Sequence, residues 1–312
     1  MRSTLLHHYS SIPIMTLTFV GKPQHWLKNT FYCLVALSLI SCSERQATAH
    51  ESPTSENTHH SLSADIIEKS FTIPGLSRDR KVRIYLPPAY NNTKQEQTRF
   101  PVIYMHDGQN LFDEKTSYAG EWQVDETLNK LSASHGLNII VVGIDNGSEH
   151  RMNELSPWPH DDFGIAEGEA YLAFITDVVK PYIDQQYRTL DDAENTVMIG
   201  SSMGGLMTHY AIIKHSNVFG KAGIFSPSYW FSEEVFRFTE GTDIPQNSRF
   251  YISVGGKEGE SMVPYAIRMT EALEDKQVSQ QNLFSHVVKD GEHNEALWVG
   301  EFENAVLWLF KR

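Results

Sequence analysis

The sequence predicts an α/β fold built on an eight-stranded, mostly parallel sheet flanked by helices. From residue 69 onward, short β-branched runs alternate with longer helical patterns, as parallel strands joined by crossover helices require. The eight runs are 70–73, 81–86, 100–105, 138–144, 196–199, 221–225, 249–254 and 283–289. The first two lie close enough for an antiparallel start, and each later run is followed by a connection that can hold a helix.

Helical patterns occupy five of these connections. They are predicted over 124–132, 171–187, 206–214, 263–276 and 295–310. In 171–187 the apolar residues recur three and four apart, as on one face of a helix, and Pro181 within it predicts a kink. Two longer connections, 145–168 and 226–248, leave the carboxyl ends of strands, where open α/β sheets bind ligands.

Length and charge narrow the classes of function. The chain has 312 residues, of which 40% are hydrophobic, enough for a sizeable core, and a formal net charge of -13. Nucleic-acid binding requires basic clusters, which this acidic sequence lacks, so we expect no nucleic-acid partner. For the same reason we do not expect the protein to bind an anionic membrane surface through its charge. The sequence does not indicate the oligomeric state.

The first 42 residues are predicted to be a signal peptide of the lipoprotein type. Lys22 and Lys28 precede an uncharged apolar run, 31–40, that is shorter than the roughly 20 residues of a membrane span. The run ends in Leu39-Ile40-Ser41-Cys42, which resembles the bacterial lipobox and makes Cys42 the expected lipidated residue. An ordinary signal with a coincidental cysteine is the alternative. The protein is therefore expected to be exported, as a periplasmic or cell-envelope lipoprotein that touches the membrane only through this anchor.

Two further segments complete the predicted organisation. Residues 43–66 are polar without an apolar period, which indicates a disordered tether, and 67–312 form the catalytic domain. Both cysteines, Cys33 and Cys42, precede this domain, so it contains no disulfide.

A Gly-x-Ser-x-Gly motif is the most specific feature of the domain. Gly200-Ser201-Ser202-Met203-Gly204 follows the apolar run 196–199 and precedes the helical pattern 206–214. A serine on such a strand-to-helix turn projects its hydroxyl from the sheet, as in the nucleophile elbow of α/β-hydrolases. The alternative is an ordinary Gly/Ser loop. The strand, turn and helix together favour Ser202 as a nucleophile. The fold class that we predict is an α/β-hydrolase fold with no large separate cap.

A serine nucleophile needs a histidine base and an acid that orients it. In this fold the chain order is Ser, acid, His, so the acid should follow the seventh strand and the histidine the eighth. Glu258 and Glu260 lie in the glycine-rich turn after the seventh run, and Asp290 and His293 follow the eighth. The pattern predicts the triad Ser202, Glu258 and His293, with Glu260 and Asp290 left open as the acid.

Two backbone N–H groups are predicted to form the oxyanion hole. One is that of Met203, directly after the nucleophile, and the other comes from the loop after the third strand, where Gly108 precedes Gln109. His106 and Asp107 in the same loop could instead ligate a metal, but no cluster with metal-ligand spacing accompanies them. We therefore expect neither a metal nor a cofactor.

These motifs together carry a resemblance to the putative esterase family of α/β-hydrolases, which includes esterase D, feruloyl, acetyl-xylan and enterochelin esterases and mycolyltransferases. It covers the chain from about residue 71 to its end and rests on Tyr104-Met105-His106-Asp107-Gly108-Gln109-Asn110-Leu111-Phe112, Arg151 with Glu154, Gly200-Ser201-Ser202-Met203-Gly204-Gly205, Gly255-Gly256-Lys257-Glu258 and Gly291-Glu292-His293-Asn294. The resemblance implies Ser202, Glu258 and His293 as nucleophile, acid and base. Asp107-Gly108, in place of the His-Gly of lipases, resembles the enterochelin-esterase branch.

The resulting hypothesis is a serine carboxylic-ester hydrolase that acts through an acyl-enzyme on a small-molecule or carbohydrate-linked ester, of acyl, feruloyl, acetyl or siderophore type. The alternatives are an acyltransferase of the same fold and a non-catalytic ligand-binding envelope lipoprotein. Asp107 and Arg151 are candidate substrate-binding residues, and Arg151 could instead pair with Glu154. Aromatic residues on loops above the sheet could also hold a flat acyl group or a sugar: Trp122, Trp158, Tyr229 and Trp230.

Overall fold

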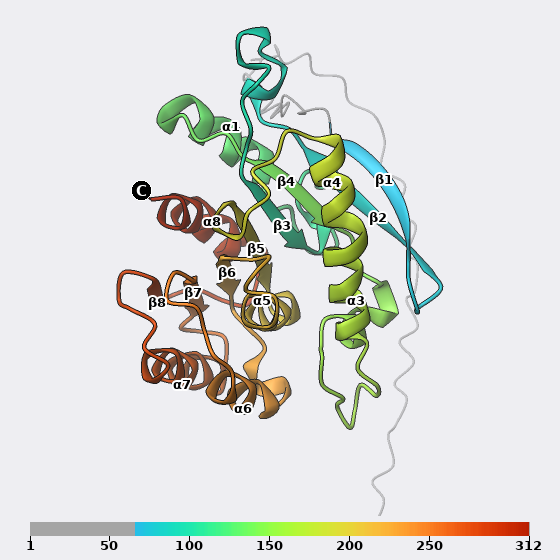
Figure 1. The fold of residues 1–312 in the computed structure, drawn as a ribbon. Coiled ribbons are helices and arrows are strands. Elements are labelled where there is room, and N and C mark those ends of the chain that lie inside the picture. The colour runs from blue at the N-terminus through green and yellow to red at the C-terminus, as the bar shows by residue number, and fades with distance from the viewer. Residues whose placement is uncertain (1–65, 312) are drawn as a thin grey trace, which may run out of the picture. The chain divides into compact units, whose positions relative to one another are not determined.

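An eight-stranded sheet forms the centre of the protein (Figure 1). The computed structural model describes residues 66–311. The predicted signal peptide, the tether as far as residue 65 and Cys42 lie outside the described residues. In sheet order the strands are β1 (Ile67–Ile73), β2 (Arg78–Tyr85), β4 (Ile140–Ile144), β3 (Val102–His106), β5 (Thr196–Ser201), β6 (Lys221–Phe225), β7 (Arg249–Gly255) and β8 (Leu283–Val288).

Strand direction follows the prediction. β1 pairs with β2, and β2 with β4, in antiparallel fashion. Every later pair, from β4–β3 through β7–β8, is parallel. The carboxyl ends of β3 and β5 to β8 therefore meet at one edge of the sheet, where loops can bring distant residues together.

Helices cover both faces of the sheet. α1 (Val124–His135) and α8 (Glu295–Leu309) lie on one face, and α3 (Gly168–Phe174), α4 (Lys180–Gln186), α5 (Met203–Lys214), α6 (Glu234–Gly241) and α7 (Met262–Asp275) lie on the other (Figure 1). A single turn, α2 (Arg151–Glu154), follows β4. Residues alternate between the two cores, so that Ile103 faces α1 and α8 while Tyr104 faces the α5 side.

All eight predicted strands are present. The described residues fall within one compact unit, which agrees with the prediction of a fold without a large separate cap. The single helix predicted over 171–187 is instead interrupted by a π-helical turn, Ile175–Val179, in which Lys180 N–H bonds to the Ile175 carbonyl. This turn ends two residues before Pro181, which has no N–H to continue the α-helical pattern. α6, inside the 226–248 connection, was not predicted. Between residues 66 and 311, none of the helices has the length and apolar character that a membrane crossing demands.

Candidate active site

Ser202 occupies a sharp turn between β5 and α5. Its backbone has φ 56° and ψ -121°, a conformation that is strained for any residue with a side chain. The turn is held by a 2.9 Å hydrogen bond from Ser202 N–H to the Phe225 carbonyl on the neighbouring strand. A Cβ on Gly200 would lie 2.6 Å from the Gly204 carbonyl carbon, so the two chain segments can cross only because residue 200 is glycine. The geometry is that of the predicted elbow.

The hydroxyl of Ser202 faces the residues that follow β6. Its Oγ lies 3.3 Å from Ser228 Oγ, and Ser228 N–H donates to the Ser202 carbonyl at 3.0 Å. Among the described residues no hydrogen bond joins Ser202 to His293. Such catalytic hydrogen bonds are often long in ligand-free proteins and shorten when substrate binds.

Glu258 and His293 form a hydrogen-bonded pair beside this turn. His293 Nδ1 lies 2.9 Å from Glu258 Oε2, and the glutamate side chain is fully buried. The other carboxylate oxygen, Oε1, accepts hydrogen bonds from Gly255 N–H and from the Ser226 hydroxyl, both at 2.6 Å. A buried carboxylate with three donors has a fixed orientation, and it can hold the imidazole with Nε2 turned away from it.

The two other carboxylates that the sequence left open lie elsewhere. Asp290 forms an exposed ion pair with Lys257, and 75% of its side chain is accessible to solvent. Glu260 is exposed, two residues beyond the buried Glu258. Of these three carboxylates, only Glu258 contacts the histidine.

Trp298 supports both members of this pair. Its indole Nε1–H donates to Ser226 Oγ at 2.9 Å, and its ring meets the His293 ring edge-on, with centroids 5.2 Å apart. Ser226 is fully buried and has φ 44°, which turns its hydroxyl toward Glu258. Ser226 and Trp298 therefore fix the orientation of Glu258 and His293. The sequence analysis identified neither residue. For Ser226 a signal was available, because a residue that directly follows β6 must lie between the ends of β5 and β7.

The loop after β3 packs closely against the end of β4. A Cβ on Gly108 would lie 2.6 Å from the carbonyl carbon of Gly143, so this approach requires glycine. Gln109 is held by its side chain, whose Oε1 accepts a hydrogen bond from Asn146 N–H at 3.0 Å. Within the described part of the chain, the backbone N–H groups of Gln109 and Met203 donate to no protein acceptor. Both are thus available to a ligand, which is what the predicted oxyanion hole needs.

Asp107, in this loop, and Arg151 form a part-buried bidentate ion pair. Arg151 Nε and Nη2 donate to Asp107 Oδ1 and Oδ2 at 2.7 and 2.8 Å, and Asn146 Nδ2 donates to Oδ1 at 2.7 Å. Burial alone would raise the pKa of Asp107, but Arg151 and Asn146 hold that pKa below its ordinary value. The suggested pairing of Arg151 with Glu154 is wrong, because Glu154 instead binds the guanidinium groups of Arg78 and Arg80.

This ion pair changes the expected roles of Asp107 and Arg151. Both oxygens of Asp107 are occupied by protein donors, so its carboxylate positions the loop rather than binding substrate. Arg151 keeps a quarter of its side chain exposed and remains a candidate for substrate contact. His106 is buried, its Nδ1 lies 2.9 Å from Tyr171 Oη, and burial lowers its pKa to about 4.

Two of the aromatic residues expected on substrate-binding loops are core residues instead. Trp122 is 4% exposed and packs against Phe225, Trp298 and Phe302. Tyr229 is fully buried, with its hydroxyl 3.0 Å from His209 Nδ1.

Trp158 packs edge-on against Tyr210 and Phe238, on the outer side of the α5 core. Trp230 is 41% exposed and stands in an aromatic cluster with His160 and Phe231. Of the four aromatic candidates, Trp230 alone is substantially exposed, because the others are covered by helices that pack over them.

Comparison with known proteins assigns the family. The model of the family described as Putative esterase matches residues 73–309. The chain belongs to this family. Uncharacterized protein YbbA of Bacillus subtilis (strain 168) is 28% identical over 246 residues, which cover 74% of this chain and 93% of the relative. Membership in an esterase family supports the hydrolysis of carboxylic esters as the reaction.

Solved structures share the fold. A ferulic acid esterase has a TM-score of 0.58 at 17% identity, with 78% of this chain and 97% of that chain covered. Enterochelin esterase from Shigella flexneri has a TM-score of 0.65 at 20% identity; 79% of this chain is covered, but only 58% of the Shigella chain. These likenesses agree with the predicted α/β-hydrolase fold.

Proposed function

We propose that the protein is a serine carboxylic-ester hydrolase that works through an acyl-enzyme at Ser202. The observation that carries the proposal is the 2.9 Å contact between His293 and the buried Glu258, at the sheet edge where the Ser202 turn lies. An imidazole oriented in this way can accept the hydroxyl proton as the serine attacks the ester carbonyl.

The proposed reaction has two steps. Ser202 Oγ adds to the carbonyl carbon while His293 Nε2 takes the proton, and the oxyanion binds the N–H groups of Gln109 and Met203. The C–O bond to the leaving alcohol then breaks, and His293 returns the proton to that alcohol. A water molecule then gives a proton to His293 and attacks the acyl-serine; the bond between the acyl carbon and Ser202 Oγ breaks, and His293 returns the proton to the serine as the free acid leaves. Glu258 keeps its hydrogen bond to His293 Nδ1 and stabilises the imidazolium in both steps.

The proposed substrate is a small-molecule or carbohydrate-linked ester with an acetyl, feruloyl or catecholate acyl group. Two observations support this range. The structural neighbours are named for ferulic acid and enterochelin esters, and the exposed ring of Trp230 offers a flat surface for a planar acyl group. In addition, the exposed quarter of the Arg151 side chain would favour an anionic substituent.

A serine-directed probe and a pair of neighbouring serine variants test the nucleophile. Wild-type protein should be labelled by a fluorophosphonate and should hydrolyse short-chain nitrophenyl esters to the free acid, even with an added alcohol. Ser202→Ala should lose labelling and at least a thousandfold in kcat, whereas the adjacent Ser201→Ala should retain both. Labelling or turnover that survives in Ser202→Ala would refute the proposal.

We also propose, from residues 1–42, that the mature protein is anchored to the cell envelope through a lipidated Cys42. Membrane fractionation of the wild type and of Cys42→Ala tests this anchor. The wild type should sediment with membranes and the variant should not; a variant that stays membrane-bound after removal of the signal would exclude lipidation at this cysteine.

A further inference from the structure

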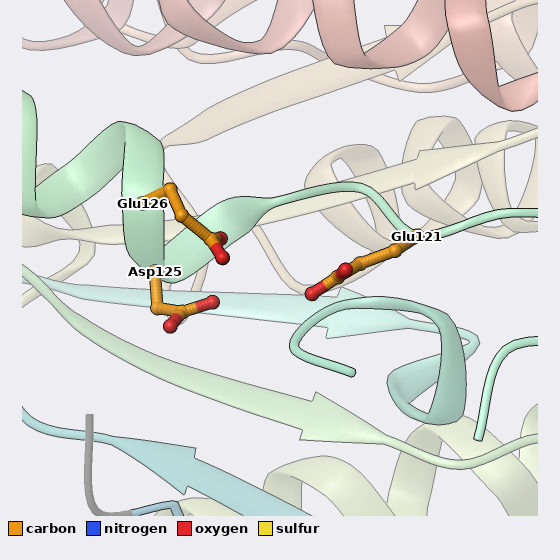
Figure 2. A group of neighbouring side chains, drawn as sticks. All are labelled: Glu121, Asp125 and Glu126. Atoms are coloured by element: carbon orange, nitrogen blue, oxygen red, sulfur yellow. The ribbon is translucent and has the colours of Figure 1, made fainter. Parts of the chain in front are cut away.

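Three carboxylates converge at the start of α1. Glu121 comes from the loop before the helix, and Asp125 and Glu126 come from its first turn (Figure 2). Figure 2 shows the two helical side chains projecting toward Glu121, whose carboxylate reaches back toward them. One oxygen from each residue can be chosen so that all three lie within 4.8 Å of one another. The cluster is separate from the Ser202, Glu258 and His293 residues of the proposed mechanism.

Two oxygens of these carboxylates have no hydrogen-bond partner among the described residues. Asp125 is only 1% exposed, and its Oδ1 is buried without a hydrogen bond to any described residue. The same is true of Glu126 Oε2. Buried oxygens of acidic side chains are normally hydrogen-bonded or bound to a cation, because leaving them without a partner is energetically costly. The orphaned Asp125 oxygen is thus an observation, independent of the clustering, that points to a ligand.

The electrostatics agree with this geometry. Burial raises the pKa of Glu121 to about 7, and the nearby Glu126, Asp113 and Glu114 raise it further. Burial also raises the pKa of Asp125 to about 7, with Glu126 as the second cause. Both shifts come from burial and from neighbouring carboxylates, and a bound cation would oppose both effects.

We propose that Glu121, Asp125 and Glu126 bind a hard divalent cation, with Ca²⁺ as the favoured ion. Oxygen-only ligands suit Ca²⁺ and Mg²⁺ rather than metals that prefer nitrogen or sulfur. Ca²⁺ accepts irregular coordination by carboxylates, whereas Mg²⁺ requires a near-ideal octahedron and usually keeps several of its water ligands, so three carboxylates from one turn and its preceding loop suit Ca²⁺ better. The sequence did not suggest this site, because the three residues match no metal-binding motif.

The bound cation would stabilise the segment that supports the proposed oxyanion loop. Trp122 N–H donates to the Asn110 carbonyl at 2.8 Å, and Val124 N–H donates to the Leu111 carbonyl at 3.1 Å. These bonds connect the cluster to the residues that directly follow Gln109. A cation bound to Glu121 and to the first turn of α1 would hold the segment 121–126 in one conformation. Both hydrogen bonds are donated from this segment, so the cation would also stabilise the loop that carries Gln109.

Binding is tested on the purified full chain, stripped with a chelator, by two readouts that do not involve activity. In the first, Tb³⁺ replaces Ca²⁺, and its luminescence is excited through Trp122, which adjoins Glu121. In the second, the melting temperature is followed as Ca²⁺ or Mg²⁺ is added at constant ionic strength. We expect saturable Tb³⁺ luminescence that Ca²⁺ displaces, and a rise in Tm of about 5 °C at a Ca²⁺ concentration a hundredfold above its Kd.

Amide variants separate a cation site from a merely structural cluster. Glu121→Gln and Asp125→Asn should lose the luminescence and the Ca²⁺-dependent shift, and in chelator they should melt no lower than the wild type because they remove like-charge repulsion. Asp162→Asn, at a carboxylate that is 85% exposed, is the matched control and should behave as the wild type. No saturable shift in the wild type, or a shift that persists in both amide variants, would overturn the site. A larger shift with Mg²⁺ than with Ca²⁺ would overturn the choice of calcium.

Discussion

Ser226 donates a 2.6 Å hydrogen bond to Glu258 and lies on the side of that carboxylate opposite His293. The serine hydroxyl has one proton, and it is used for this bond, so the hydroxyl oxygen is free to accept from Trp298. The chain Trp298–Ser226–Glu258–His293 fixes the direction in which the imidazole points. Ser226, Glu258 and His293 follow β6, β7 and β8, which are neighbouring strands. The packing of these strands therefore sets the orientation of the imidazole.

Removing the Ser226 hydroxyl should weaken catalysis without preventing substrate binding. Ser226→Ala and Ser226→Gly both delete the donor, and the glycine variant also relieves the positive φ at this position. We expect kcat to fall about tenfold to a hundredfold in both, with little change in KM, as for loss of one hydrogen bond to a charged group. Steady-state kinetics on a nitrophenyl ester give the answer; unchanged kcat in both variants would exclude the positioning role.

The acid of the proposed triad can be identified by three isosteric substitutions. Glu258→Gln preserves shape but removes the charge that stabilises the imidazolium, so kcat should fall by about 10³ to 10⁴. Glu260→Gln and Asp290→Asn are the controls, and each should stay within about twofold of the wild type because neither side chain contacts His293. A comparable loss in either control would mean that the carboxylate of that control, rather than Glu258 alone, acts as the acid.

The Asp107–Arg151 pair should matter for stability. Arg151→Met leaves the Asp107 carboxylate with only its hydrogen bond from Asn146, at a cost of about 3 kcal/mol in the free energy of unfolding, the lower end of the range for breaking a buried pair. The double variant Arg151→Met/Asp107→Asn removes both charges and should recover most of this loss. Urea unfolding of the two single variants and the double variant measures the coupling. Strictly additive losses would show that the two residues do not stabilise the fold as a pair.

Stability should also fall in mild acid because of His209. This histidine is fully buried, and Thr239, which donates its proton to the Val235 carbonyl, accepts a hydrogen bond from His209 Nε2–H. Nδ1 therefore accepts from Tyr229 and has no room for a proton. Burial lowers the pKa of His209 to about 3, from an ordinary value of 6.5.

The sign and size of this effect follow from linkage. Below pH 6.5 the unfolded chain binds a proton at residue 209 that the folded chain does not bind, so stability is lost as pH falls toward the folded pKa. Between pH 7 and pH 5 the loss is about 2 kcal/mol. His209→Gln keeps a donor and an acceptor but does not titrate. Between pH 7 and pH 5 the free energy of unfolding of this variant should therefore fall by about 2 kcal/mol less than that of the wild type. Equal pH dependence in both proteins, measured by urea unfolding, would contradict the assignment.

The arrangement of the sheet could be predicted because each strand can be recognised from a short stretch of sequence. Each strand is a short β-branched run, and counting strands placed Ser202, Glu258 and His293 at one edge, since parallel strands end on the same side. The choice of Glu258 over Glu260 could not be made in this way. It depends on burial against Ser226 and Gly255, which lie on or beside different strands.

The positions of the loop aromatics could not be predicted for the same reason. Trp122 follows a loop in the sequence, but Trp298 and Phe302, some 180 residues later, cover it when α8 packs on the sheet. The carboxylate cluster at α1 was likewise invisible, because Glu121 approaches Asp125 only through the turn that precedes the helix.

β8 is the terminal strand of the sheet and has a single neighbour, β7. The proposed general base is carried on the connection that leaves this strand, whereas the proposed nucleophile follows the interior strand β5. Outer elements open more readily than inner ones. Gentle heating should therefore detach the imidazole reversibly while most of the fold persists, so that enzymatic activity disappears before cooperative denaturation begins.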